Sequence, residues 1–174
     1  VETTGLVVGA MARHDTIANS PESRTAIPAL ANLAASIGDP QVRNRGTLGG
    51  SIANNDPAAD HTAGVLGLGA TIITDRRRIA ADLFFPAMFE TDLEPDELVV
   101  AVSFPIPLRA CYAKLPQTAS RYARVGVMVA STPTGVRVAV TGAAPKVFRH
   151  IEMEAALERD FSQIELDSVV TRSE

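Results

Sequence analysis

The sequence predicts an α+β fold in two lobes, in which a mixed lobe of helices and strands precedes a small antiparallel sheet with helices on one face. Apolar residues at helical spacing dominate the first part of the chain. Strand-like segments with short connections follow one another in the second part, which favours antiparallel pairing. The prolines of segment 105–108 mark the change between the two patterns. We therefore expect lobes over residues 1–106 and 107–174.

The first lobe is expected to contain both helices and strands. A helix is predicted over 27–37, because apolar residues recur there at helical spacing and Gly38 follows the last turn. A second helix is predicted from Pro57 to about Leu68, with Asp56 as its N-cap, since aspartate followed by proline is typical of a helix start. The segments predicted to be strands are 6–10, 71–74, 78–80 and 98–104.

The second lobe is expected to contain three strands and then two helices. The predicted strands are 112–115, 123–131 and 136–142, and the predicted helices are 150–159 and 162–170. The single cysteine, Cys111, is interpreted as a small buried apolar residue of a strand. One cysteine forms neither an intrachain disulfide nor a Cys-x-x-Cys metal site. An iron–sulfur cluster, which needs about four thiolates, would therefore lie on another polypeptide.

The composition excludes several classes of function. Apolar residues make up 46% and charged residues 21% of the 174 residues, which is ordinary for a globular protein. The net charge is −4 and the basic residues are dispersed, so nothing indicates nucleic-acid binding. The one basic run, Arg76–Arg78, is interpreted as a solvated hairpin turn. The longest apolar runs are too short to cross a bilayer.

The segment Thr47-Leu48-Gly49-Gly50-Ser51 is the strongest candidate for a ligand site. With Gly46, it places three glycines within five residues, which would allow positive φ angles and a close approach to a bulky ligand. Exposed amides in such a turn would form a concavity that suits phosphate oxygens. A tight structural turn between a loop and a helix explains the same glycines, because short glycine motifs have a high false-positive rate.

The titratable residues near this turn give no strong sign of a catalytic or metal site. Asp56, Asp60 and His61 are close in sequence, but adjacent residues on a helix point about 100° apart, so they do not form a ligand set. His14 is either a residue that orients a loop or an ordinary surface histidine. No Ser-His-Asp arrangement is readable, and we expect no catalytic side chain.

The long segment Ile37–Asp60 resembles the FAD-binding subunit of molybdenum hydroxylases, a family that includes the medium subunit of aerobic carbon monoxide dehydrogenase and xanthine dehydrogenase relatives. Weaker similarity covers most of the chain, at 8–14, 84–98 and 138–145. The resemblance implies a FAD-binding lobe of the molybdopterin dehydrogenase type over 1–106, which would be the second half of the family's domain. A small, incomplete C-terminal flavoprotein lobe would follow, and the resemblance implies that the family's N-terminal lobe would precede residue 1 and is not part of this sequence.

The resemblance also implies which residues hold FAD. These are Thr47, Leu48, Gly49, Gly50, Ser51, Asp60, Val99, Lys114 and Tyr122. Ser51 stands where the family usually has Asn, and it keeps one hydrogen bond with a shorter reach. Tyr122 would lay its ring on the isoalloxazine, and Lys114 would place positive charge near the flavin or its phosphate. The residues alone leave structural roles open: a helix carboxylate for Asp60, a core residue for Val99, and surface residues for Lys114 and Tyr122.

The function that the resemblance implies is that of an oxidoreductase subunit. It would pass electrons from 2Fe–2S clusters on a small partner subunit, reduced at a molybdenum cofactor on a large one, through FAD to an external acceptor. The alternative is an assembly or interaction subunit of such a complex that no longer binds flavin. The missing lobe and Ser51 motivate that alternative. A cytoplasmic location is implied, with peripheral association with the inner face of the membrane left open.

Overall fold

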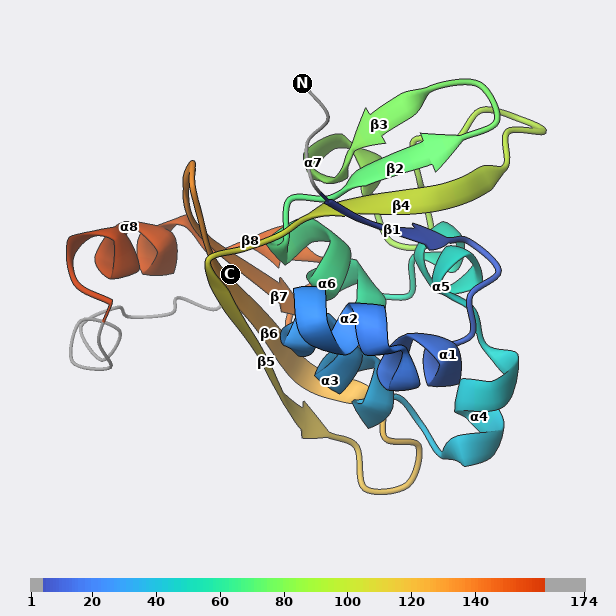
Figure 1. The fold of residues 1–174 in the computed structure, drawn as a ribbon, viewed down its shortest axis with the longest axis horizontal. Coiled ribbons are helices and arrows are strands. Elements are labelled where there is room, and N and C mark those ends of the chain that lie inside the picture. The colour runs from blue at the N-terminus through green and yellow to red at the C-terminus, as the bar shows by residue number, and fades with distance from the viewer. Residues whose placement is uncertain (1–4, 162–174) are drawn as a thin grey trace.

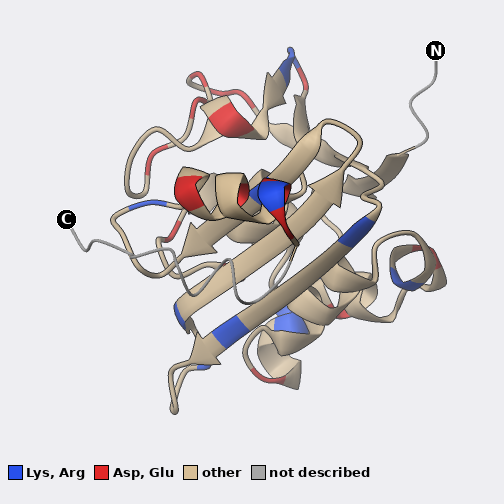
Figure 2. Ribbon diagram, turned by 90° about the vertical axis from the view of Figure 1, so that its left-hand side faces the viewer, with Lys and Arg blue, Asp and Glu red and all other residues tan. Residues whose placement is uncertain are grey.

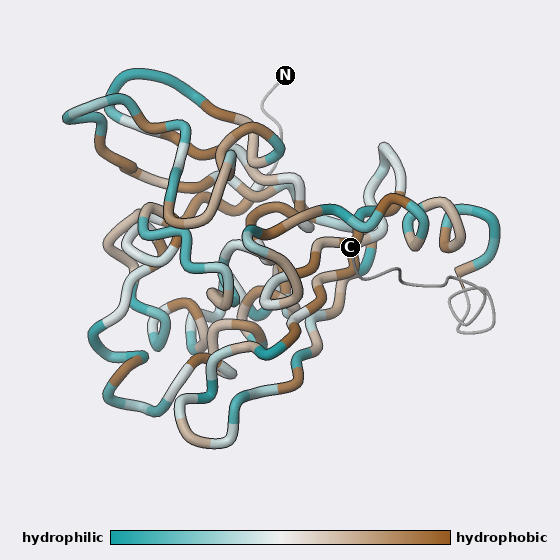
Figure 3. The backbone as a smooth tube through the Cα atoms, turned by 180° about the vertical axis from the view of Figure 1, so that it is seen from behind, coloured by the Kyte–Doolittle hydropathy of each residue, from teal (hydrophilic) through white to brown (hydrophobic). Residues whose placement is uncertain are grey.

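The computed structural model describes residues 5–161, so the predicted helix over 162–170 lies outside the described residues. The described chain forms two four-stranded sheets, with a group of helices packed between and beside them (Figure 1). Hydrophilic residues are concentrated in loops at the periphery (Figure 3). No helix in residues 5–161 has both the length and the apolarity that a bilayer span requires.

The first sheet has the strand order β1-β4-β2-β3, and each neighbouring pair is antiparallel. Its strands are β1 (Gly5–Gly9), β2 (Thr71–Thr74), β3 (Arg78–Ala80) and β4 (Val99–Pro105). They confirm the four segments predicted as strands.

The β2–β3 turn is fixed by ion pairs, and the exposed side chains of Arg76–Arg78 confirm the interpretation of a solvated hairpin turn. The Arg77 guanidinium donates to both carboxylate oxygens of Glu97 at 3.0 Å, and it also pairs with Asp92. Glu97 further accepts from Thr74 Oγ1 at 2.7 Å, and its side chain is fully buried. The carboxylate of Glu97 therefore ties the hairpin to the segment that leads into β4.

The second sheet follows the chain in the order β5-β6-β7-β8, with antiparallel pairs throughout. Its strands are β5 (Arg109–Pro116), β6 (Ala123–Thr132), β7 (Gly135–Thr141) and β8 (Phe148–Arg149). The first three confirm the predicted strands, and β8 was too short to predict. Cys111 is exposed on the edge strand β5, so the prediction that it is buried is wrong. Successive residues of a strand point to opposite faces of the sheet. Ala110 and Tyr112, the neighbours of Cys111, face the core, so Cys111 faces away from it.

Most helices precede the second sheet. They are α1 (His14–Asn19), α2 (Pro21–Ala26), α3 (Pro28–Ser36), α4 (Pro40–Arg45), α5 (Leu48–Asn54), α6 (Asp60–Gly67) and α7 (Ala81–Phe84). Helix α3 confirms the helix predicted over 27–37. Proline occupies the first turn of α2, α3 and α4, where its missing N–H leaves no intrahelical bond unmade.

Helix α6 begins at Asp60, so the predicted start at Pro57 with Asp56 as N-cap is wrong. The Asp56 carboxylate instead accepts from Ala58 N at 2.8 Å within a turn. The Pro57 carbonyl accepts from Thr141 Oγ1 and from Gly142 N, which holds the turn against β7. Every residue of α6 is buried, because this helix lies at the centre of the molecule.

Helix α8 (Ile151–Arg159) confirms the helix predicted over 150–159 and lies across the second sheet (Figure 2). It packs on Val136 and Val138, whereas Met128 and Ala139 of the same sheet join the main core. Successive residues of a strand point to opposite faces of the sheet. The sheet therefore carries α8 on one face and the helices of the first half on the other, and the prediction of helices on one face is incomplete.

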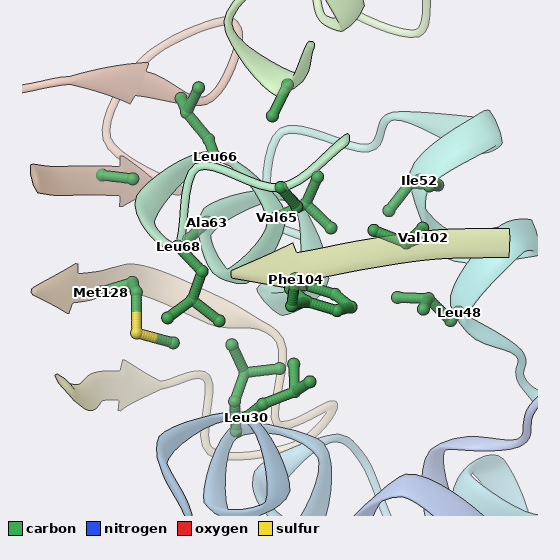
Figure 4. Close-up of a cluster of buried hydrophobic side chains, with 14 of the residues drawn as sticks. Leu30, Leu48, Ile52, Ala63, Val65, Leu66, Leu68, Val102, Phe104 and Met128 are labelled. Atoms are coloured by element: carbon green, nitrogen blue, oxygen red, sulfur yellow. The ribbon is translucent and has the colours of Figure 1, made fainter. Parts of the chain in front are cut away.

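One hydrophobic cluster contains residues of both sheets. Leu30 of α3, Leu68 beyond α6, Phe104 of β4 and Met128 of β6 are all buried in it (Figure 4). Because the two sheets share these contacts, the segment 105–108 separates the sheets but does not separate two cores.

Candidate functional site

A cleft of about 470 Å³ opens between the segment from α4 to α6 and the loop that joins β5 to β6. This volume is within the range of small-molecule sites. The polar and glycine residues that line it are His14, Gly38, Arg45, Gly46, Thr47, Gly50, Ser51, Asn54, Asp56, Asp60, Ser120, Arg121 and Tyr122. The structure thus brings Thr47, Gly50, Ser51 and Asp60 together with Tyr122, which lies far along the chain.

The amides of the glycine turn are already hydrogen-bonded, so the prediction of exposed N–H groups for a phosphate is wrong. Thr47 caps α5, and its Oγ1 accepts from Gly50 N at 3.1 Å. The amides of Leu48 and Gly49 donate to the carbonyls of Ala12 and Ala10, and Ser51 N donates to the carbonyl of Thr47. The N–H groups of 48–51 therefore build the helix start and its junction with β1.

The glycines of the turn allow close packing and do not adopt positive φ. The positive-φ glycines among residues 5–161 are at 38, 69, 135 and 142, which corrects the prediction for this turn. A Cβ on Gly46 would lie 2.5 Å from His14 Nε2, and one on Gly49 would lie 2.6 Å from Ala10 Cβ. A Cβ on Gly50 would meet only Thr47 Oγ1, at 3.0 Å. Gly50 is thus the glycine of this turn that leaves space on the cleft side.

Four of the residues implied to hold FAD lie outside the lining of this cleft: Leu48, Gly49, Val99 and Lys114. Leu48 is fully buried in the main core, and Gly49 packs against Ala10. Val99 begins β4, where it opposes Thr74 and packs partly buried against the core. Leu48 and Gly49 thus lie in α5 beside residues of the lining, and Val99 has the core-strand role that the residues alone left open.

Asp60 is the centre of a buried polar network at the cleft. Its carboxylate accepts from Tyr112 Oη at 2.5 Å and from Lys114 Nζ at 2.9 Å. The side chains of Lys114 and Asp60 are only 7% and 4% exposed, which excludes a surface role for either residue. Burial raises the pKa of Asp60, and the hydrogen bonds from Tyr112 and Lys114 oppose that rise. Burial and the neighbouring Asp60 likewise raise the pKa of Tyr112.

The β5–β6 loop forms the other wall of the cleft. Tyr122 is 51% exposed and lines the cleft, so part of its side chain is accessible to a ligand. The loop is held by Gln117 N, which donates to the Tyr122 carbonyl, and by Lys114 Nζ, which donates to the Arg121 carbonyl at 2.9 Å. Arg121 adopts a positive φ of 60°. Lys114 therefore holds both walls together, through Asp60 on one side and Arg121 on the other.

A neighbouring cleft of about 440 Å³ lies on the far side of Lys114. Its lining residues are Asn32, Ser36, Tyr112, Lys114, Pro116, Gln117, Thr118 and Arg121. Arg121 lines both clefts, so the two spaces adjoin at the Lys114–Asp60 pair.

Sequence reasoning missed Arg45, Arg121 and the part that His14 plays. Arg45 ends α4 directly before the glycine turn. Arg45 and Arg121 both line the cleft. The basic loop before Gly46 was a visible signal for Arg45. His14 is 5% exposed, so the reading as a surface histidine is wrong, and its Nδ1 lies 3.1 Å from His61 Nε2. Burial lowers the pKa of His61 to about 3.

No group of three or more His, Cys, Asp or Glu side chains in the described part of the chain could hold a metal ion. Asp56 faces its own turn, Asp60 faces Lys114, and His61 faces His14. Each member of the cluster noted in the sequence thus has a separate protein partner.

Residues 1–107 match the model of one protein family, the FAD binding domain in molybdopterin dehydrogenase. The chain belongs to this family. The chain is 34% identical over 160 residues to the carbon monoxide dehydrogenase medium chain of Hydrogenophaga pseudoflava, an alignment that covers 85% of this chain and 56% of the relative. It is also 34% identical over 161 residues to the glyceraldehyde dehydrogenase medium chain of Sulfolobus acidocaldarius, covering 86% and 57%.

Solved structures show the same fold as this FAD-binding domain and the sheet that follows it. A carbon monoxide dehydrogenase structure from Hydrogenophaga pseudoflava, which lacks the Mo-pyranopterin moiety, superposes with a TM-score of 0.86 at 34% identity. The match covers 95% of this chain and 62% of that chain. The reconstituted CO dehydrogenase from Oligotropha carboxidovorans gives 0.88 at 28% identity, covering 95% and 63%. The chain thus spans little more than half the length of these relatives, and the family resemblance seen in the sequence is confirmed.

Proposed function

We propose that this chain is the FAD-binding part of an electron-transfer subunit in a molybdenum-hydroxylase-type dehydrogenase. Family membership is the observation that carries the proposal, supported by relatives named as medium chains of such dehydrogenases. The one cysteine of this chain cannot ligate an iron–sulfur cluster, and in this proposal the clusters would lie on a small partner subunit and the molybdenum cofactor on a large one. Electrons would pass from the clusters through FAD to an external acceptor.

The cleft between α5 and the β5–β6 loop fits part of a dinucleotide. The hydroxyls of Thr47 and Ser51 and the guanidinium groups of Arg45 and Arg121 suit phosphate and sugar oxygens. Gly50 leaves open the space that a side chain would fill. The amides of 48–51 take no part, since they are bonded within the protein. In this proposal, side chains therefore supply the phosphate donors, in place of the backbone amides that the glycines first indicated.

The chain's own residues would hold and orient the cofactor. When bound, FAD supplies the redox chemistry, because it exchanges single electrons and electron pairs. Tyr122 covers one face of the ligand and excludes water. Asp60 is held in place by Tyr112 and Lys114 and presents a fixed carboxylate to the cleft. Leu48, Gly49 and Val99 support the wall from the core side.

Flavin titration tests this proposal directly. We expect the complete protein, purified with any subunits that accompany it, to bind FAD close to one per chain. Tyr122→Ala is expected to weaken binding roughly 5- to 150-fold, because stacking on an aromatic ring contributes about 1–3 kcal/mol. Tyr122→Phe keeps the ring and is expected to bind within about twofold of the wild type. An FAD-free complex, or equal binding by both variants, would contradict the proposal.

A second candidate is an assembly subunit that no longer binds flavin. The observation that favours it is the bonding of every amide over 48–51 within the protein, since these groups then offer nothing to a phosphate. This candidate predicts that the chain copurifies with larger subunits while calorimetric titration with FAD gives no heat. Heat of binding with a stoichiometry near one would exclude it.

A further inference from the structure

Two buried histidines connect the cleft with the core. His14 begins α1 and lines the cleft, whereas His61 lies in α6 and is fully buried. Their rings are 4.9 Å apart at the centroids, and His61 Nε2 lies 3.1 Å from His14 Nδ1. These nitrogens share one hydrogen bond, so one ring must donate and the other accept. The direction of that bond decides what His14 offers to the cleft.

The surroundings of His61 select the direction of the bond. His61 Nδ1 is a fully buried atom with no hydrogen-bond partner. If His14 donated from Nδ1, His61 would carry its own proton on this Nδ1, which would leave a buried N–H without an acceptor. Buried N–H groups without partners are rarer than buried acceptors without donors. His61 therefore donates from Nε2, and its Nδ1 is an unprotonated lone pair.

The proton of His14 is consequently on Nε2. Burial lowers the pKa of both rings, so both are neutral near pH 7. Nε2 lies 2.5 Å from the position of a Cβ on Gly46, at the start of the segment that lines the cleft. The fully buried unpartnered side-chain atoms in residues 5–161 are Asn55 Oδ1 and His61 Nδ1. His14 Nε2 has no hydrogen-bond partner within residues 5–161 and is not one of these fully buried atoms, and we infer that its N–H faces the cleft that His14 lines.

We propose that His14 is a ligand-contacting residue of the cleft, which donates from Nε2–H to an oxygen of the pyrophosphate or sugar portion of the bound dinucleotide. His61 is a positioning residue that fixes the tautomer of His14. Gly46 is required because any side chain there would occupy the place of this N–H. The inference rests on the proposed function, since it takes FAD as the ligand.

Two substitutions of His14 separate the contact with the ligand from the contact with His61. The Asn amide reaches about as far as Nδ1, so His14→Asn keeps an acceptor for His61 and loses the donor to the cleft. The Gln amide reaches about as far as Nε2, so His14→Gln keeps a donor to the cleft and loses the hydrogen bond with His61. We expect His14→Asn to be the more stable variant in thermal unfolding and to bind FAD roughly 3- to 10-fold more weakly than the wild type.

His14→Gln should show the opposite order, with lower stability and FAD affinity within about twofold of the wild type. Affinities that follow the order of stability, or that are unchanged in both variants, would overturn the inference. Nitrogen-15 NMR of the ligand-free protein gives an independent readout, because it identifies the protonated ring nitrogen. A proton on His14 Nδ1 would also overturn it. Failure of the wild type to bind FAD would contradict the proposed function, and the NMR result would still decide the tautomer.

Discussion

At the scale of single residues, Gly46, Gly49 and Gly50 have three different roles within one short segment. Gly46 makes room for His14, Gly49 allows α5 to meet β1 at Ala10, and Gly50 leaves the cleft open. The sequence could show that small residues gather here. It could not show which contact makes each glycine necessary, because the contacting residues, such as His14 and Ala10, lie more than thirty positions earlier in the chain.

Alanine at Gly49 should therefore lower the stability of the fold, whereas alanine at Gly50 should lower the affinity for FAD. Gly49→Ala places a Cβ 2.6 Å from Ala10 Cβ, and we expect a loss of roughly 1–3 kcal/mol in the free energy of unfolding, as for overpacked cores. Gly50→Ala meets only Thr47 Oγ1 and should change stability little while it weakens FAD binding. Urea unfolding and flavin titration of both variants measure the two effects. Equal destabilisation by the two variants would be incompatible with this assignment.

The buried Lys114–Asp60 pair makes Lys114 essential to the fold as well as to the cleft. Lys114→Met leaves the carboxylate of Asp60 buried without its counter-ion, and we expect a loss of roughly 3–5 kcal/mol in stability. The pKa of Asp60 is raised by burial, so without Lys114 the folded state favours the protonated carboxyl, and stability should fall as pH rises. The double variant Asp60→Asn, Lys114→Met is the control, and its stability should be higher and less dependent on pH.

At the scale of elements, the sequence predicted those that are long or strongly patterned. Helix α3 and strands β1 to β7 follow from helical spacing, alternation and proline positions. Helices α1, α2, α4 and α5 have six or seven residues, which is too few for a 3.6-residue period to be recognised. The start of α6 was misjudged because Asp56 closes a turn that β7 holds in place, a tertiary contact that no local pattern contains.

The candidate site was predictable to the extent that local motifs form it. Thr47, Gly50, Ser51 and Asp60 lie in one stretch, and family resemblance added Tyr122. The cations Arg45 and Arg121 were missed, because dispersed arginines carry no signal until the fold brings two of them to one cleft. The network of Tyr112 with Asp60 was missed for the same reason, since 52 positions separate the two residues.

The β2–β3 hairpin depends on the buried Glu97, and its stability should depend on pH. Hydrogen bonds from Arg77 lower the pKa of Glu97 to about 2. A carboxyl whose pKa is lower in the folded state stabilises the fold above its unfolded pKa, near 4.5, and loses that contribution as pH falls toward 2. We expect Glu97→Gln to be less stable than the wild type at pH 7, with a difference that shrinks as pH falls from about 5 to 2. Urea midpoints across this range measure it, and a constant difference would contradict the assignment.

At the scale of the whole molecule, polar contacts join the two sheets in addition to the shared hydrophobic core. Arg137 of β7 donates to the Leu66 carbonyl of α6 and to the carboxylate of Asp82 in α7 at 2.8 Å. Arg149 of β8 reaches the same Asp82 carboxylate at 3.3 Å. The second sheet is thus attached to α6 and α7, which stand on either side of β2 and β3 in the chain. A cleft formed between these parts keeps its shape only while they stay docked.

The shared core predicts that both sheets unfold together. Met128 of β6 is fully buried against Gly67 of α6, and we expect Met128→Ala to cost roughly 2–5 kcal/mol. Val129 points to the α8 side of the same strand and is only partly buried, so Val129→Ala is the matched control and should cost less. Hydrogen exchange in increasing urea is the decisive measurement, because it follows β4 and β6 amides separately. Loss of protection in both strands at one urea concentration is expected for the Met128→Ala variant, whereas earlier loss in β6 alone would indicate two lobes that fold independently.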